Sequence, residues 1–226
     1  MIRKRFSFIY IAIYVAMIRT IYVSSLSVIY SIWAIENREI NDDLLEWARQ
    51  WGVLLASTSM DLTQWWRLVS APLLHLDYSH LLSNLLLLFI ALLLSSRASH
   101  LSHVKPKLTF QDLLFIITSK VNPVSILFYG FMIAGLRVLY GIEAWSLGLS
   151  GVAMACLSKE CVELAFYLKH LNHYRRFFLC ILPWGLALSS FGNDIDISSH
   201  LIGTLLGTFW GIWLGSAYGA CKTRDS

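Results

Sequence analysis

Two short motifs, far apart in the sequence, contain residue types that together could carry out acyl transfer. Ser150 lies in Gly148-Leu149-Ser150-Gly151 and begins an apolar run of small residues, while His200 begins a second run that contains Gly203 and Gly207. A serine hydroxyl becomes a useful nucleophile when a neighbouring base takes its proton. Alone, each motif is more typical of a helix start, since serine and glycine are common at N-caps and turns. The pair predicts a Ser150–His200 dyad.

The composition indicates that both motifs belong to a membrane protein. Of the 226 residues, 57% are hydrophobic and only 14% are charged, whereas a soluble domain carries about 25% charged residues. The length allows roughly five to seven spans of about 20 residues each. We therefore expect a single all-α, polytopic domain over residues 1–226, surrounded by the lipid bilayer, with no second folded domain and no nucleic-acid partner.

Long apolar runs predict six spans. They cover residues 6–34, 78–94 and 122–140, a short run that begins at Ser150, then 177–191 and 200–218. The first run follows a basic start and exceeds the roughly 7–15 apolar residues of a signal peptide, so we expect an uncleaved helix. Arg19 interrupts this run. We expect it to snorkel to the inner interface, a functional intramembrane arginine being the alternative.

The polar segment 36–70 contains apolar residues at helical spacing, namely Leu44, Trp47, Ala48, Trp51, Leu54 and Leu55. This pattern predicts an interfacial helical loop between the first and second spans, with its tryptophans at headgroup level. Residues 108–118 are too few to cross a bilayer and are expected to lie on its surface.

The distribution of basic residues predicts the orientation. An even number of spans places most lysines and arginines on one side: Arg3, Lys4, Arg5, Arg97, Lys105, Lys107, Lys120, Lys159, Lys169, Arg175, Arg176, Lys222 and Arg224. The loops on the opposite side are mostly acidic. The positive-inside rule then places both termini in the cytoplasm, and a bacterial inner membrane and a eukaryotic secretory membrane fit equally.

The position of the first charges after Ser150 predicts its depth. Lys159 and Glu160 follow within about 15 Å along a helix. If these charges reach water at the inner face, Ser150 lies well below the outer face of a hydrocarbon slab about 30 Å thick.

A glycine stripe predicts how the two motifs meet. His200 shares one helical face with Gly203, Gly207, Gly211 and Gly215, and the fourth span offers Gly151, Ala153 and Ala155 as small partners. Such stripes let membrane helices approach closely. That approach could bring the His200 imidazole within hydrogen-bonding reach of Ser150 Oγ.

Acyl transfer also needs donors for the developing oxyanion. His80 and Asn84 lie on one helical face, and the Ser150 amide is a third candidate donor. Hydrogen bonding between helices is the alternative role for the two side chains. Asp194 and Asp196 fall in a loop and are interpreted as solvated acids, so the residues predict a dyad.

Cysteine and histidine spacing predicts no disulfide framework, metal or cofactor. The cysteines, Cys156, Cys161, Cys180 and Cys221, show no paired spacing. The His100-x-x-His103 and His170-x-x-His173 pairs lack companions at ligand spacing.

In order and spacing, these motifs resemble the rhomboid intramembrane serine proteases over most of residues 60–218, the expected core. The matching set is Trp66-Arg67, His75, His80-x-x-x-Asn84, Gly148-Leu149-Ser150-Gly151 and His200-x-x-Gly203-x-x-x-Gly207. The resemblance implies Ser150 as nucleophile and His200 as general base. It also implies that His80, Asn84 and the Ser150 amide form the oxyanion hole.

The resemblance further implies a substrate and supporting residues. The substrate would be a membrane helix of another single-pass or multi-pass protein, admitted near the fifth span and the loop 191–199 and cut beside small residues. Trp66-Arg67 would stabilise the first loop, and His75 would be a structural neighbour. Two features depart from the family: Met154 replaces the common aromatic residue that packs against the histidine, and the connection 95–120 is longer than in compact bacterial members.

Two other classes of function remain open. A catalytically inactive rhomboid-like protein would bind membrane clients or serve in their quality control, and would need neither Ser150 nor His200. A small transporter or channel could line a polar path with Arg19, Arg137 and His80, although the spans lack a paired acid for it.

Overall fold

The structure, a computed structural model, describes residues 2–38, 43–54, 62–98, 121–142, 146–168, 172–189 and 197–222. Its helices are α1 (Ile2–Arg38), α2 (Leu44–Trp51), α3 (Arg67–Ser70), α4 (Tyr78–Ala98), α6 (Pro123–Leu139), α7 (Ser150–Tyr167), α8 (His173–Leu188) and α9 (Ile197–Lys222). Short 3-10 turns, η1 (Leu62–Gln64) and η2 (Ala71–Leu73), precede and follow α3. Within these ranges, the β-type pairing consists of one isolated bridge between Leu54 and Ser146.

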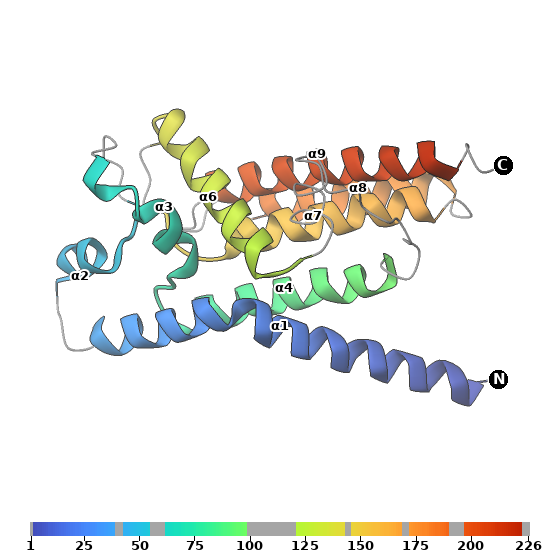
Figure 1. Cartoon of the computed structure of the whole chain (residues 1–226), viewed down its shortest axis with the longest axis horizontal. Helices are drawn as coiled ribbons and strands as arrows, with labels where there is room; N and C mark the ends of the chain where they lie inside the picture. The colour runs from blue at the N-terminus through green and yellow to red at the C-terminus, as the bar shows by residue number, and fades with distance from the viewer. Residues whose placement is uncertain are drawn as a thin grey trace.

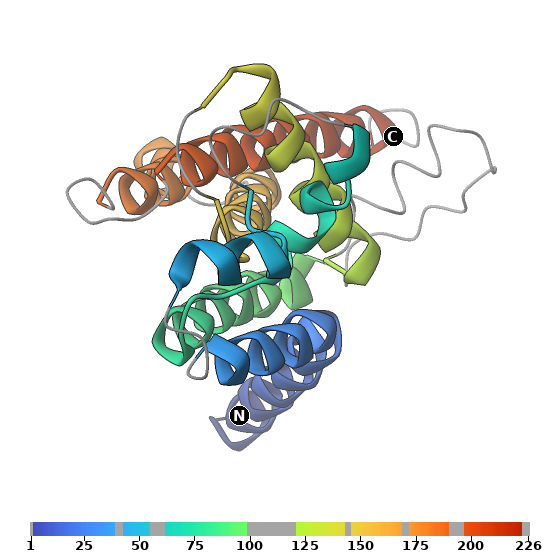
Figure 2. The ribbon, with the colours of Figure 1, turned by 90° about the vertical axis from the view of Figure 1, so that its left-hand side faces the viewer.

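Helix α7 is the centre of the bundle. It packs most extensively against α9 and also contacts α4, α8 and α6, while α1 packs against α4 (Figures 1 and 2). The residues of α7 from Ser150 to Glu163 are buried, and several of them are small, which allows the neighbouring helices to pack closely around α7. The first turn of α1 and the last turn of α9 lie at one end of the molecule, and α2 and α3 lie at the other (Figure 1).

A helix occupies the position of each predicted span. Three of them are long and apolar enough to cross a membrane, over Ile13–Asn37, Tyr78–Ser95 and Ile197–Ser216, and Pro123–Leu139 is a shorter apolar helix. Helix α6 begins where the third span was predicted to begin, because the Asn122 side chain accepts a hydrogen bond from the Ser125 amide and Pro123 needs no amide partner. The number of six spans stays a prediction.

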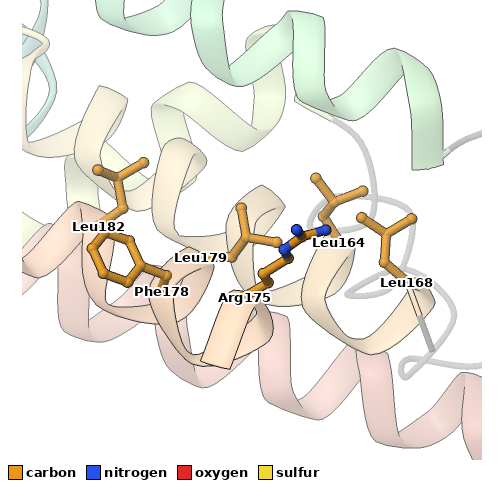
Figure 3. A pocket seen from close by; sticks show the side chains of 6 residues that line it. All are labelled: Leu164, Leu168, Arg175, Phe178, Leu179 and Leu182. Atoms are coloured by element: carbon orange, nitrogen blue, oxygen red, sulfur yellow. The ribbon is translucent and has the colours of Figure 1, made fainter. Parts of the chain in front are cut away.

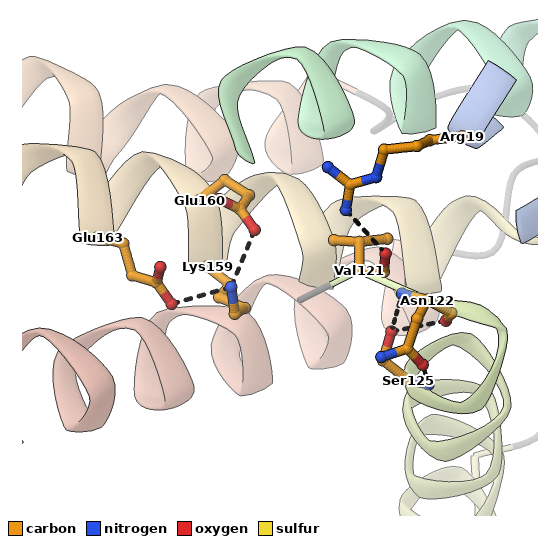
Figure 4. A network of polar contacts seen from close by, with 7 residues as sticks. All are labelled: Arg19, Val121, Asn122, Ser125, Lys159, Glu160 and Glu163. Atoms are coloured by element: carbon orange, nitrogen blue, oxygen red, sulfur yellow. Dashed lines mark hydrogen bonds and ion pairs between the residues drawn. The ribbon is translucent and has the colours of Figure 1, made fainter. Parts of the chain in front are cut away.

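The charged residues of α7 are buried, so the prediction that they reach water is wrong. The exposed fractions of Lys159, Glu160 and Glu163 are 0%, 1% and 4%. Lys159 Nζ lies 2.9 Å from a carboxylate oxygen of each glutamate (Figure 4). Because these charges are paired inside the protein, they give no measure of the depth of Ser150 in the bilayer.

Arg19 is also bound within the protein. Its Nη2 donates a hydrogen bond of 3.1 Å to the Val121 carbonyl, just before α6 (Figure 4). The arginine therefore links α1 to the start of α6, and its snorkelling to the inner interface stays a prediction.

The loop between α1 and α4 is helical, as predicted, but its tryptophans face inward. Trp47 and Trp51 are buried against Ala34 and Leu74. Trp47 Nε1 donates to the Ala34 carbonyl at 2.8 Å, and Tyr30 Oη donates to the Trp51 carbonyl at 2.6 Å. These rings anchor the loop to α1, and their level relative to the lipid headgroups stays a prediction.

Some predictions fall outside the described residues. They concern the surface segment 108–118, the histidines His100, His103 and His170, the two loop acids Asp194 and Asp196, and most of the loop 191–199.

Candidate active site

Ser150 is the first residue of α7, and a sharp turn at Gly148 leads into it. Gly148 has φ +102°, a backbone conformation that favours glycine. A Cβ at this position would lie 2.9 Å from His80 Cε1 and 3.3 Å from Asn84 Nδ2. The Gly148 amide donates to the Ala71 carbonyl at 2.9 Å. The turn thus brings both predicted oxyanion donors of α4 close to the residue pair that precedes Ser150.

The predicted contact between the two motif-bearing helices is confirmed. A Cβ on Gly203 would lie 2.0 Å from the Gly151 carbonyl oxygen, and one on Gly207 would lie 2.1 Å from that of Ala155. A Cβ on Gly151 would in turn lie 2.8 Å from the Ser199 carbonyl oxygen. The backbones of α7 and α9 therefore touch, which requires small residues.

Ser150 and His200 flank this backbone contact. Ser150 directly precedes Gly151, and His200 directly follows Ser199. Their exposed fractions are 7% and 8%. Both are thus nearly removed from the surface, each in the first turn of a helix, and the two helix starts converge. The glycine spacing predicted this convergence of the two helices, and the contact of the His200 ring with Ser150 Oγ stays a prediction.

Arg137 of α6 holds the start of α9. This structural role was not predicted from the sequence. It is fully buried, and its Nη1 donates to Ser198 Oγ and, at 3.4 Å, to Ser199 Oγ. Ser146, in the turn before α7, adds a contact of 3.1 Å to Ser199 Oγ. A signal existed, because a buried arginine needs hydrogen-bond acceptors, and Ser198-Ser199 precede His200 directly. Because Arg137 is engaged here, it is poorly placed to line a transport path.

His75 connects three parts of the chain around the site. Its Nδ1 lies 2.9 Å from Ser31 Oγ of α1, and its Nε2 lies 2.9 Å from Asn84 Nδ2 of α4. The Leu149 amide, next to Ser150, donates to the same Nε2 at 3.3 Å. Since Nε2 accepts both bonds, the ring proton belongs on Nδ1, where it can be donated to Ser31.

Burial favours this neutral form of His75. Removal from water, with a smaller contribution from His80, lowers the pKa of His75 to about 3. The imidazole is therefore a neutral hydrogen-bonding junction at physiological pH. A protonated ring would have no lone pair on Nε2 for the Asn84 and Leu149 donors.

The start of α4 is fixed by Asp77. Its Oδ1 accepts hydrogen bonds from the Ser79 hydroxyl at 2.6 Å and from the His80 amide at 2.8 Å. These two bonds lower the pKa of the Asp77 carboxyl. With the first turn held, His80 and Asn84 lie one turn apart on the face toward Gly148. Asn84 donates one N–H of its side-chain amide to His75 Nε2, and the same amide group has a second N–H.

Comparison with known families decides what kind of protein carries this arrangement. The family model described as "Rhomboid domain" matches residues 62–217, which include every motif residue from Trp66 to Gly207. The chain is a member of the rhomboid family. A comparison with curated proteins found no match. Membership and the apolar helices make the chain an integral membrane protein, and narrow its function to an intramembrane protease or pseudoprotease that acts on membrane proteins in the bilayer.

In this rhomboid, Arg67 holds the loop between α2 and α3. It is buried, and its Nη1 and Nη2 donate to the carbonyls of Val53 and Arg49 at 2.8 and 2.9 Å. The guanidinium also lies 5.0 Å from the Trp66 ring centroid. The Trp66 ring leaves no space for a side chain on Gly52, where a Cβ would lie 2.1 Å away. The Trp66-Arg67 pair therefore fastens the loop next to the motifs.

Met154, at the position where the family resemblance led us to expect an aromatic residue, is buried one turn after Ser150. An unbranched thioether side chain adapts to irregular space. The Met154 side chain can therefore fill the space below Ser150 that an aromatic ring would otherwise occupy.

Proposed function

We propose that this rhomboid is an active serine endopeptidase that cleaves transmembrane segments of other membrane proteins, with Ser150 as nucleophile and His200 as general base. The observation that carries the proposal is the backbone contact of Gly203 with Gly151. This contact brings the first turns of α7 and α9 together at the two residues that the chemistry needs.

The proposed reaction follows the general course of serine hydrolysis. His200 takes the Ser150 hydroxyl proton while Oγ attacks the scissile carbonyl, and then passes the proton to the leaving amine. Water, activated by His200, hydrolyses the acyl-enzyme. The oxyanion is stabilised by N–H donors from His80, Asn84 and the Ser150 amide, in a site where few water molecules compete.

The remaining motif residues support this chemistry in the proposal. His75 positions Asn84 and the Leu149 amide, Gly148 lets α4 approach, and Gly151, Gly203 and Gly207 allow the helix contact. Trp66 and Arg67 fasten the first loop. The chain is proposed to form a single six-span domain with cytoplasmic termini, which admits single-pass or multi-pass substrates near α8 and the loop 191–199.

A fluorophosphonate probe tests the nucleophile directly. Wild-type protein in detergent should be labelled, and Ser150→Ala and His200→Ala should each lose at least about 10³-fold in labelling rate. Ser158→Ala is a matched control, because Ser158 is another buried serine of α7, bonded to Thr208 at 2.8 Å and remote from the site. If folded wild type is neither labelled nor able to cleave a model membrane helix, the chain is a pseudoprotease and the proposal is wrong.

A further inference from the structure

An apolar groove lies between the end of α7 and the start of α8, at the opposite end of α7 from Ser150. Its volume is about 420 Å³. Five of its six lining side chains are apolar; the lining residues are Leu164 of α7, Leu168 directly after α7, and Arg175, Phe178, Leu179 and Leu182 of α8 (Figure 3). Phe178 and Leu182 are exposed. The groove therefore opens on the side that a bilayer would cover.

Arg175 gives the groove a positive charge. It lies in the first turn of α8, and its guanidinium is placed over the groove between Leu179 and Leu164 (Figure 3). The acid next to Leu164, Glu163, is buried and paired with Lys159 at 2.9 Å. It does not neutralise the groove. An occupant that fits both features has an anionic head and an apolar tail.

We propose that this groove binds an anionic glycerophospholipid from the leaflet around the first turn of α8. The lipid phosphate pairs with the Arg175 guanidinium, and one acyl chain lies along Leu164, Leu179 and Leu182. Basic pockets between membrane helices commonly bind anionic headgroups in this way. The proposal does not depend on whether the chain is a protease.

Charge favours a lipid over a protein occupant. The predicted orientation puts the start of α8 on the side with most lysines and arginines, and the spans of other membrane proteins carry the same basic flanks on that side. Arg175 would repel such a flank. A symmetric contact between two copies of the chain would likewise bring two Arg175 side chains together.

Native mass spectrometry of the full chain, released from detergent with added lipid, tests the site. Phosphatidylglycerol should be retained as one molecule per chain, at least fivefold more than phosphatidylcholine with the same acyl chains. Arg175→Ala should remove this preference. Leu179→Trp, which fills the groove and keeps the charge, should also reduce retention at least fivefold.

Arg176→Ala is the matched control. It removes an equal charge from the neighbouring position, where Arg176 Nη2 lies 3.1 Å from His173 Nδ1 and the side chain does not line the groove. Retention of phosphatidylglycerol should stay within twofold of wild type. Equal losses in the Arg175 and Arg176 variants, or equal retention of the two lipids by wild type, would overturn the proposal.

A photo-crosslinking amino acid at Leu182 identifies the occupant independently. In vesicles that contain phosphatidylglycerol and a model transmembrane peptide, the adduct should have the mass of the chain plus one lipid. An adduct with the peptide or with a second copy of the chain, or the absence of a lipid adduct, would instead contradict the proposal.

Discussion

Two polar regions on α7 are built in opposite ways. The region at its first turn brings Ser150 together with residues from α1, α4, α6 and α9, through hydrogen bonds such as those of His75 and Arg137. The region midway along the helix pairs Lys159 with glutamates one and four residues later on the same helix. The first is assembled by the tertiary fold, whereas the second is largely complete within two turns.

The difference indicates where each region gets its rigidity. A charge cluster whose members pair with one another can be buried by packing, and these three residues are at most 4% exposed. A site assembled from several elements keeps its geometry only while every supporting contact holds. We therefore expect changes at the midway region to act on stability, and changes around Ser150 to act first on reactivity.

The largest expected effect is that of Lys159→Met. It leaves two buried carboxylates without their ammonium partner, which should lower the free energy of unfolding by about 3–5 kcal/mol. Denaturation in mixed micelles measures this change. Adding Glu160→Gln and Glu163→Gln should recover most of the loss, and a triple variant as unstable as the single one would contradict this account.

Gly203→Ala should have the next largest effect. The new methyl would meet the Gly151 carbonyl at 2.0 Å, so the helices must separate by on the order of 1 Å, a displacement that can cost about 100-fold in rate. The rate of fluorophosphonate labelling measures it. Gly185→Ala is the control, because a Cβ there meets nothing within 4 Å. Similar rates in the two variants would refute the packing explanation.

Acid should weaken the region around His75. The ring titrates near pH 6.5 when unfolded and near 3 when folded, so the unfolded state binds more protons between these values. Stability is complete above pH 6.5 and falls below it, by about 2 kcal/mol at pH 5. Unfolding measured from pH 7 to 5 should show this slope, and His75→Gln should flatten it. An unchanged slope in His75→Gln would contradict this account.

The smallest expected effect is that of Ser198→Ala. It removes one acceptor from Arg137, a change of about 1 kcal/mol, and should slow labelling roughly fivefold by loosening the turn that carries His200. The free energy of unfolding should fall by about 1 kcal/mol or less. A normal labelling rate in Ser198→Ala and in Ser199→Ala would show that Arg137 does not position this turn.

The sequence predicted the helix positions and the contact of α7 with α9, because both depend on local periodicity. Glycines every fourth residue mark a helix face whichever partner it meets. The depth of Ser150 in the bilayer could not be derived in the same way. The estimate assumed that Lys159 reaches water, whereas Lys159 is buried. The Glu163 that pairs with it stands at the i, i+4 position, and that spacing was the overlooked signal.

Tertiary partners were the least predictable features. The direction of Trp47 depends on Ala34, and the role of Arg137 depends on Ser198 and Ser199. None of these pairs has a spacing that a periodic pattern reveals. The Ser150–His200 dyad itself stays a prediction until the probe experiment is done.

The Gly203–Gly151 contact also limits which substitutions the chain can accept over time. A side chain on Gly203 would require the Gly151 backbone to move, one on Gly151 would require the Ser199 backbone to move, and no compensating single change is smaller than glycine. Random variants screened for a working protein should therefore keep glycine at both sites, while Gly135 and Gly185, which a Cβ would leave uncrowded, should drift freely.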